Sequence, residues 1–112
     1  MLTKQLRMKR NTQFTYVFKK GNAFKGKHLM IIVAPKKYKL PKIGLVVTKK
    51  IGKSVVRNHV KRLIRESIRN YVPQLSPAYD LIVVARQGVE CATFEEINKT
   101  ILELLRKSNA LT

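Results

Sequence analysis

The feature that most restricts the possible folds is a long amphipathic segment, predicted as one helix from Ser54 to about Asn70. Ser54 follows Gly52 and suits the N-cap, and Pro73 lies just beyond the predicted end. One side of this helix is expected to face a sheet: Val56, Val60, Leu63, Ile64 and Ser67. The other side carries a cationic file at four-residue spacing, with Asn58 and Arg62 beside it: Arg57, Lys61, Arg65 and Arg69. Such a helix is stable only when its apolar side packs on another element, so strands are expected in the same domain.

Three apolar runs are predicted to form these strands, namely His28–Ala34, Ile43–Thr48 and Tyr79–Arg86. The first two are close in sequence, which favours an antiparallel pair. The third is an unbroken apolar run, which predicts a strand buried on both faces. Gly44 within the second run indicates a bulge or a close backbone approach.

Two further helices are predicted near the ends of the chain. The first is Asn11–Lys20, with Asn11 as its N-cap and Gly21 ending it in the left-handed conformation. The second opens with Thr93 and Glu96, which are spaced as a capping box. Its apolar stripe is expected to pack on the core: Phe94, Ile97, Ile101, Leu104 and Leu105.

The resulting order, α-β-β-α-β-α, predicts an α+β fold, a single-domain α-β sandwich. A chain of 112 residues suits one core, so residues 1–112 are expected to form one domain, with residues 1–10 as a flexible basic N-terminus. No apolar run approaches the ~20 residues that span a bilayer. The single Cys91 cannot form an internal disulfide, so a cytoplasmic location is expected.

Charge narrows the range of partners. The chain has 24 Lys and Arg against 6 Asp and Glu, a net charge of +18 that repels itself unless a polyanion neutralises it. The excess is uneven, because four of the six acids lie in residues 90–112. The positive field therefore belongs to the rest of the domain.

The cationic file of the central helix has three interpretations. A solvated face is the ordinary one, but it would carry interleaved acids, and Glu66 is the only acid on this helix. Adsorption to a membrane would need a wide apolar face with aromatic side chains, which this helix lacks. The density of arginine instead favours phosphate binding, since guanidinium groups bind phosphate through paired hydrogen bonds. We therefore expect a nucleic-acid partner and no membrane.

Phe14 and Phe18 are four residues apart and share one face of the first helix. They are expected either to belong to the core or to line a groove where unpaired bases stack, each stack contributing ~1–3 kcal/mol. Flanking lysines would then hold the phosphate backbone: Lys19, Lys20, Lys25 and Lys27.

No catalytic centre is evident in the sequence. The six acids are scattered, whereas a two-metal nuclease needs several convergent carboxylates. His28 and His59 are far apart in sequence, and no glycine-rich phosphate loop is present. We expect no catalytic residue, no metal site and no RNA cleavage by the protein alone.

The run from Lys49 to Glu66, with Arg57-Asn58-His59 at its centre, resembles the signature of the bacterial ribonuclease P protein subunits. The resemblance continues in Phe14–Gly21 and in Asp80–Arg86, so it covers most of the chain. The family's motif reads Arg-Asn-Arg. Here His59 keeps the hydrogen-bonding capacity and loses the permanent charge.

This resemblance implies that the protein joins a large catalytic RNA, and that the holoenzyme hydrolyses precursor tRNA to release its 5′ leader. The RNA and its magnesium ions would do the chemistry, with no cofactor on the protein itself. It also implies a left-handed β-α-β crossover between the strands at 43–48 and 80–86, against the usual right-handed rule.

The resemblance further assigns two sets of binding residues. Those facing the catalytic RNA are Lys50, Lys53, Arg57, Asn58, His59, Lys61, Arg62 and Arg65. Those expected to line a groove for the single-stranded leader are Phe14, Phe18, Ile32, Val46, Thr48 and Lys49. Ile32 stands where the family tends to carry an aromatic residue. The alternative is a general RNA-binding protein, such as a ribosomal protein or an RNA chaperone, with no role in processing.

Overall fold

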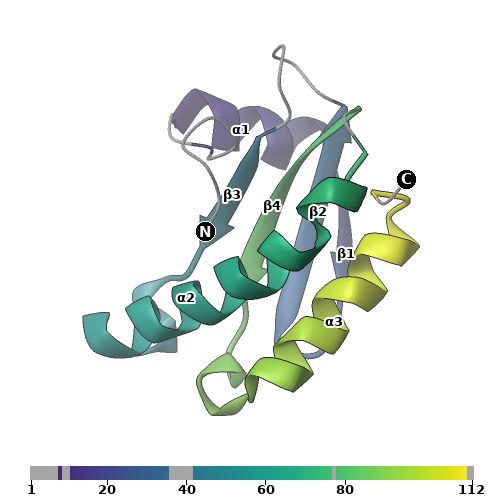
Figure 1. The fold of residues 1–112 in the computed structure, drawn as a ribbon. Coiled ribbons are helices and arrows are strands. Elements are labelled where there is room, and N and C mark those ends of the chain that lie inside the picture. The colour runs from purple at the N-terminus through teal and green to yellow at the C-terminus, as the bar shows by residue number, and fades with distance from the viewer. Residues whose placement is uncertain (1–7, 9–10, 36–41, 77, 111–112) are drawn as a thin grey trace.

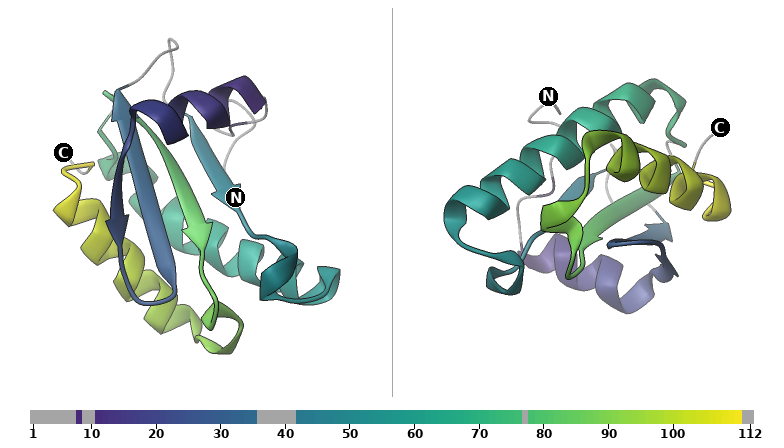
Figure 2. Two further views of the ribbon diagram at one scale, coloured as in Figure 1. Left: turned by 180° about the vertical axis from the view of Figure 1, so that it is seen from behind. Right: turned by 90° about the horizontal axis from the view of Figure 1, so that it is seen from below.

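The computed structural model describes residues 8, 11–35, 42–76 and 78–110. A four-stranded sheet separates two helical layers (Figures 1 and 2). The helices are α1 (Asn11–Lys20), α2 (Ser54–Tyr71) and α3 (Phe94–Lys107), with short 3-10 turns η1 (Lys49–Ile51), η2 (Val72–Gln74) and η3 (Val89–Cys91). The strands are β1 (Asn22–Lys25), β2 (Leu29–Pro35), β3 (Ile43–Val46) and β4 (Tyr79–Ala85). The α+β class is confirmed.

Strand β1 is an addition to the predicted order, which becomes α-β-β-β-α-β-α. Its four residues, Asn-Ala-Phe-Lys, carry little apolar signal and form an edge strand beside β2. Only Phe24 faces the larger core, so a sequence pattern has almost nothing to detect.

The antiparallel pairing predicted for the runs His28–Ala34 and Ile43–Thr48, which contain β2 and β3, is wrong. The sheet order is β1-β2-β4-β3, so β4 lies between β2 and β3, antiparallel to the first and parallel to the second. The reason is burial: β4 is the unbroken apolar run, and the centre of the sheet covers both of its faces. Because β3 and β4 are parallel, α2 forms the crossover between them, and the left hand of that crossover stays a prediction.

Two hydrophobic cores fill the two sides of the sheet. The larger lies beneath α2 and α3 and includes Ile31, Val83 and Ile64. The smaller lies beneath α1 and includes Val17, Ile32 and Ile82. In Figure 2, α1 crosses one end of the sheet, and neither of the other two described helices covers the remainder of that face.

Several local predictions need correction. Lys53, not Ser54, is the N-cap of α2, and no side chain caps that end. Gly21 is not in the left-handed conformation. A glycine is needed there because an added Cβ would lie 2.6 Å from Cγ2 of Ile32. At Gly44 a side chain comes close, not the predicted backbone, since a Cβ there would lie 2.6 Å from Cε1 of Phe14.

The set of α2 residues that packs on the sheet differs from the predicted set at the two ends of the helix. Val56 is 36% exposed, while Ile68 joins the buried set of Val60, Ile64 and Ser67. Figures 1 and 2 show the reason, because the first turns of α2 extend past the edge of the sheet.

Of the segment predicted to be flexible, the structure describes only Met8. Its side chain is buried in the smaller core, and its N–H donates to the carbonyl of Ile43 at 2.8 Å. Residue 8 is therefore docked against β3. None of the described helices has the length and hydropathy of a membrane span.

Candidate nucleic-acid interface

The outer side of α2 presents the cationic file to solvent, because the opposite side of the helix is buried on the sheet. Arg57, Lys61 and Arg65 are partly exposed, and Arg69 is exposed. The neighbouring members of the predicted interface are also exposed: Lys50, Lys53, Asn58, His59 and Arg62. The tertiary structure therefore brings this predicted set together on one surface, which we call the α2 face.

Two contacts orient side chains on the α2 face. Nε of Arg57 donates to the carbonyl of Gly52 at 3.2 Å, which ties the helix to the turn before it. Nη2 of Arg62 lies 3.4 Å from Nδ1 of His59. A guanidinium only donates, so a hydrogen bond here requires Nδ1 as the acceptor, a role that an arginine at position 59 would not offer.

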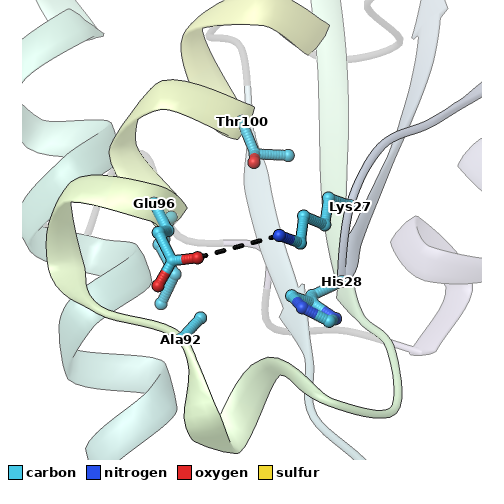
Figure 3. Close-up of a pocket in the computed structure, with 6 residues that line it drawn as sticks. Lys27, His28, Ala92, Glu96 and Thr100 are labelled. Carbon is cyan, nitrogen blue, oxygen red and sulfur yellow. Dashed lines mark ion pairs between the residues drawn. The ribbon is translucent and has the colours of Figure 1, made fainter.

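Most of the positive charge on the α2 face has no acidic partner within the described part of the chain. An ion pair joins Nζ of Lys27, between β1 and β2, to Oε2 of Glu96 on α3 at 3.9 Å, and neither residue belongs to α2 (Figure 3). Both side chains are substantially exposed, so this pair adds little stability. Arg57, Lys61, Arg62 and Arg69 pair with no acid among the described residues.

The C-terminal half of α2 is hollowed. Arg62, Arg65 and Arg69 line a shallow depression together with Glu66. Three guanidinium groups around one carboxylate leave this depression with a net positive charge, which suits an anionic group of a partner.

A second surface lies on the open part of the sheet, on the side of α1. Strand register places Met30 opposite Val84 and Val84 opposite Val46, so these three side chains cross the sheet as one row. All three are partly exposed and border the smaller core. Lys25 on β1 extends the row at one end, and exposed Thr48 and Lys49 follow β3 at the other. We call this surface the open row.

Helix α1 forms one wall of the open row. Val17 points into the sheet, and the hydroxyl of Tyr16 donates to the carbonyl of Pro35 at 2.9 Å, toward the far end of β2. Successive helical residues are turned by about 100°, so Tyr16 and Phe18 lie on opposite flanks of Val17. Phe18 therefore lies on the flank that faces the open row, and its side chain is 48% exposed.

The predicted groove residues differ in how accessible they are. Phe14 is partly buried against Gly44, so it packs in the smaller core as well as bordering the groove. Ile32 is only 6% exposed and lies beneath α1, so it is a core residue. Met30 and Val84 also belong to this surface, and neither was predicted from the sequence. Met30 could have been predicted, because alternation along a strand places it on the same face as Ile32, two residues away. The position of Val84 depends on the order of the strands in the sheet, which the sequence does not show.

No group of three His, Cys, Asp or Glu side chains converges anywhere in residues 8, 11–35, 42–76 and 78–110. Asp80 is buried, and its carboxylate accepts from the backbone N–H of Lys42 at 2.8 Å, which joins β4 to the start of β3. What the two surfaces present is positive charge, hydrogen-bond donors and apolar side chains.

These features define a class of protein: a small α+β domain with a cationic helix face and an open, lysine-flanked sheet face. The comparisons with known proteins identify the family. The family model described as Ribonuclease P matches residues 2–109, and the chain belongs to this family.

Relatives agree over nearly the whole length. The ribonuclease P protein component of Oceanobacillus iheyensis is 40% identical over 111 residues, covering 98% of this chain and 92% of that protein. That of Clostridium botulinum strain 657 is 36% identical over 106 residues, covering 94% and 96%. The structure of the Staphylococcus aureus RNase P protein superposes with a TM-score of 0.87 at 29% identity, covering 96% and 98%. The family resemblance seen in the sequence is confirmed.

Proposed function

We propose that this protein binds the catalytic RNA of ribonuclease P through the α2 face and the 5′ leader of precursor tRNA through the open row. In this way it assists the endonucleolytic removal of the leader. The observation that carries the proposal is the α2 face itself: its arginines and lysines lie along the accessible side of the helix, and Arg57, Lys61, Arg62 and Arg69 pair with no acid among the described residues.

The geometry of the α2 face suits a structured RNA. At 1.5 Å per residue, the file from Arg57 to Arg69 is roughly 18 Å long, enough to contact several successive phosphates. Like charges at four-residue spacing weaken a helix, and phosphates relieve that repulsion while releasing counterions. RNA binding is therefore favoured by the same charges that cost the free protein stability.

The open row suits a single strand. Its apolar centre offers Met30, Val84 and Val46 to base faces, and Phe18 adds an aromatic side chain from α1. Lysines at both ends provide charge for the backbone on either side of these bases: Lys25 and Lys49. A paired helix would hide its base faces, so an unpaired leader fits this surface better.

In this proposal the protein carries no cofactor and no catalytic residue. Magnesium ions held by the RNA would activate the water and stabilise the leaving oxygen, the role that metal ions take in phosphodiester hydrolysis. The protein's part is to position the substrate and to neutralise the charge where leader and RNA meet.

The direct test is cleavage of a leader-bearing precursor tRNA by a bacterial ribonuclease P RNA at low magnesium, with and without this protein. We expect clear stimulation that weakens steeply with salt, the log–log slope of binding being about −0.7 to −0.9 per neutralised phosphate. Absence of stimulation would refute the proposal. Protein incubated with RNA and magnesium alone is expected to leave the RNA intact.

A second test separates the two surfaces. Phe18→Ala is expected to weaken binding of leader-bearing precursor more than binding of mature tRNA, because only the precursor reaches the open row. Arg57→Ala is expected to weaken chiefly the complex with the catalytic RNA. Phe18 is 48% exposed and belongs to neither hydrophobic core, so its truncation leaves both cores intact. Stimulation without any preference for the leader would instead support the general RNA-binding alternative.

A further inference from the structure

Two exposed valines stand at the start of α2. Val55 is 81% exposed and Val56 is 36% exposed. In the described part of the chain, Phe18 is the only other large apolar side chain that is at least as exposed as Val56. Val55 belongs to neither hydrophobic core. Figure 1 and the left view of Figure 2 show that this end of α2 projects past the edge of the sheet. We call Val55 and Val56 the valine tip.

The valine tip is held in place by the turn before it. A Cβ at Gly52 would lie 3.1 Å from Cβ of Val56, so the glycine backbone and Val56 are in close contact. Arg57 binds the carbonyl of the same glycine. Valine is also stiff at χ1 within a helix, so Val55 loses little conformational freedom when a partner covers it.

The surroundings of the valine tip are wholly cationic or polar. Its exposed neighbours in the chain are Lys49, Lys50, Lys53, Ser54, Asn58 and His59. The first turn of α2 contains no acid, and no side chain caps its N–H groups, so the positive end of the helix dipole is also exposed. An apolar patch within such a field matches a partner that offers apolar surface and negative charge within a few ångströms.

An unpaired ribonucleotide has this combination, because its base and ribose present apolar surface while its phosphates are charged. A nucleotide within a duplex hides its base faces by stacking. A bilayer would need a wider apolar face than two valines provide. An acidic protein could satisfy the charge, and the experiment below separates that possibility from RNA.

We infer that the valine tip packs on the base or ribose of an unpaired nucleotide of the RNA bound by the α2 face, while the surrounding lysines hold the adjoining phosphates. This inference rests on the proposed function and adds an apolar, salt-independent contact to it. Val55 would then set which part of the RNA the start of α2 can occupy.

The first experiment compares Val55→Thr with Val55→Ile in binding to a bacterial ribonuclease P RNA across a salt series. Threonine has the shape of valine and a similar helix propensity, so the exposed site should fold unchanged. We expect Val55→Thr to weaken binding about four-fold, the effect of removing one methyl-sized apolar contact, with the salt slope unchanged. Val55→Ile should bind as the wild type does.

Lys53→Ala provides the contrast and Lys99→Ala on α3 the matched control. Loss of Lys53 should reduce the magnitude of the log–log salt slope by about 0.7–0.9, whereas Lys99→Ala should leave both affinity and slope unchanged. If Val55→Thr binds with wild-type affinity, or changes the salt slope as Lys53→Ala does, the apolar contact does not exist.

The second experiment locates the contact. A photoreactive azidophenacyl group is attached to Val55→Cys in a Cys91→Ser background, since Cys91 is itself exposed. Crosslinks to nucleotides that are unpaired in the RNA secondary structure are expected. Crosslinks confined to duplex segments, or no crosslink from a bound complex, would overturn the inference. A crosslink that forms only in cell extract would also overturn it and would indicate an acidic protein as the partner. Wild-type protein that fails to bind the RNA would refute the proposed function as well.

Discussion

Helices α2 and α3 lie side by side on the same face of the sheet, yet their ends are built in opposite ways (Figure 1). The hydroxyl of Ser67 on α2 donates to Oδ1 of Asn98 on α3 at 2.7 Å, so the two helices share one packed interface. The first turn of α3 has a complete capping box and two acids, Glu95 and Glu96, and its last turn has Arg106 and Lys107. Both ends of α3 therefore complement the helix dipole.

The N-terminal end of α2 has neither a side-chain cap nor acids to complement the helix dipole. Lys53 stands at the N-cap without a side-chain bond, and no acid follows in the first turn. Its arginines and lysines repel one another at four-residue spacing, at a cost of roughly 0.2–0.5 kcal/mol per pair. The charges at the ends of α3 therefore stabilise the free protein. The charges on α2 destabilise the free protein and become favourable only when a polyanion is bound.

The largest expected difference between the helices is in RNA affinity. Arg62→Ala on α2 should weaken binding to ribonuclease P RNA by about 1–3 kcal/mol, because a charged hydrogen bond to phosphate is lost. Arg106→Ala on α3 is the matched control and should leave the affinity unchanged. Filter binding or fluorescence anisotropy at fixed salt measures both, and equal losses would remove the distinction between the two helices.

The next effect concerns the stability of the free protein. Thr93→Ala should lower the free energy of unfolding by about 1 kcal/mol, because the N–H of Glu96 loses its hydroxyl acceptor at 3.2 Å. Thr93→Ser keeps that oxygen and should retain most of the stability. Urea denaturation gives the values, and RNA affinity should be the same in both variants.

A single substitution on α2 should move stability and binding in opposite directions. Ser54→Asp places a carboxylate in the first turn, where it should stabilise the free protein by about 0.3–1 kcal/mol through the helix dipole. The same charge should weaken RNA binding, since it faces phosphates beside Lys53. Ser54→Asn is the uncharged control. An increase in both stability and affinity would contradict the view that the charges of α2 lower the stability of the free protein and raise its affinity for RNA.

The smallest effect is a pH dependence confined to α3. The backbone N–H and the hydroxyl of Thr93 hold the pKa of Glu96 below its ordinary value of 4.5, with Lys27 adding to the shift. A carboxylate whose pKa is lowered on folding stabilises the protein fully above its unfolded pKa, and this contribution is lost as the pH falls through the folded value.

Wild-type protein should therefore lose more stability between pH 6 and about pH 3 than Glu96→Gln, which keeps an amide oxygen at the cap but does not titrate. Glu95→Gln, in the same turn and outside the capping box, should follow the wild type. Urea melts at a series of pH values measure the difference. A Glu96→Gln curve parallel to that of the wild type would show that the capping carboxylate carries no pH-dependent stability.

Much of the local structure could be predicted from the sequence, because it depends on neighbouring residues. Helix α1 has the predicted ends, α2 begins at the predicted residue, and the capping box of Thr93 and Glu96 forms as expected. The cationic file needed only helical spacing. The N-cap of α2 could not be predicted in this way, because Ser54 entered the helix and Lys53 took the capping position.

The open row is the part of the candidate site that local patterns missed. Met30 and Ile32 alternate on one strand and share one face, so their sequence signals are the same. Only the packing of α1 over one end of the sheet buries Ile32 and leaves Met30 accessible. Val84 joins Met30 and Val46 because β4 lies between their strands, which reverses the pairing that sequence spacing favoured.

By itself the sequence determined the helices, the cationic side of α2, the apolar character of β4 and the family to which the chain belongs, since hydrogen bonding within a helix and charge spacing are local. The tertiary structure alone decided the order of the strands, which apolar residues remain accessible and how far α2 projects beyond the sheet. Those outcomes depend on which surfaces, distant in the sequence, pack together and exclude water. That packing depends on the complete fold and not on any local segment.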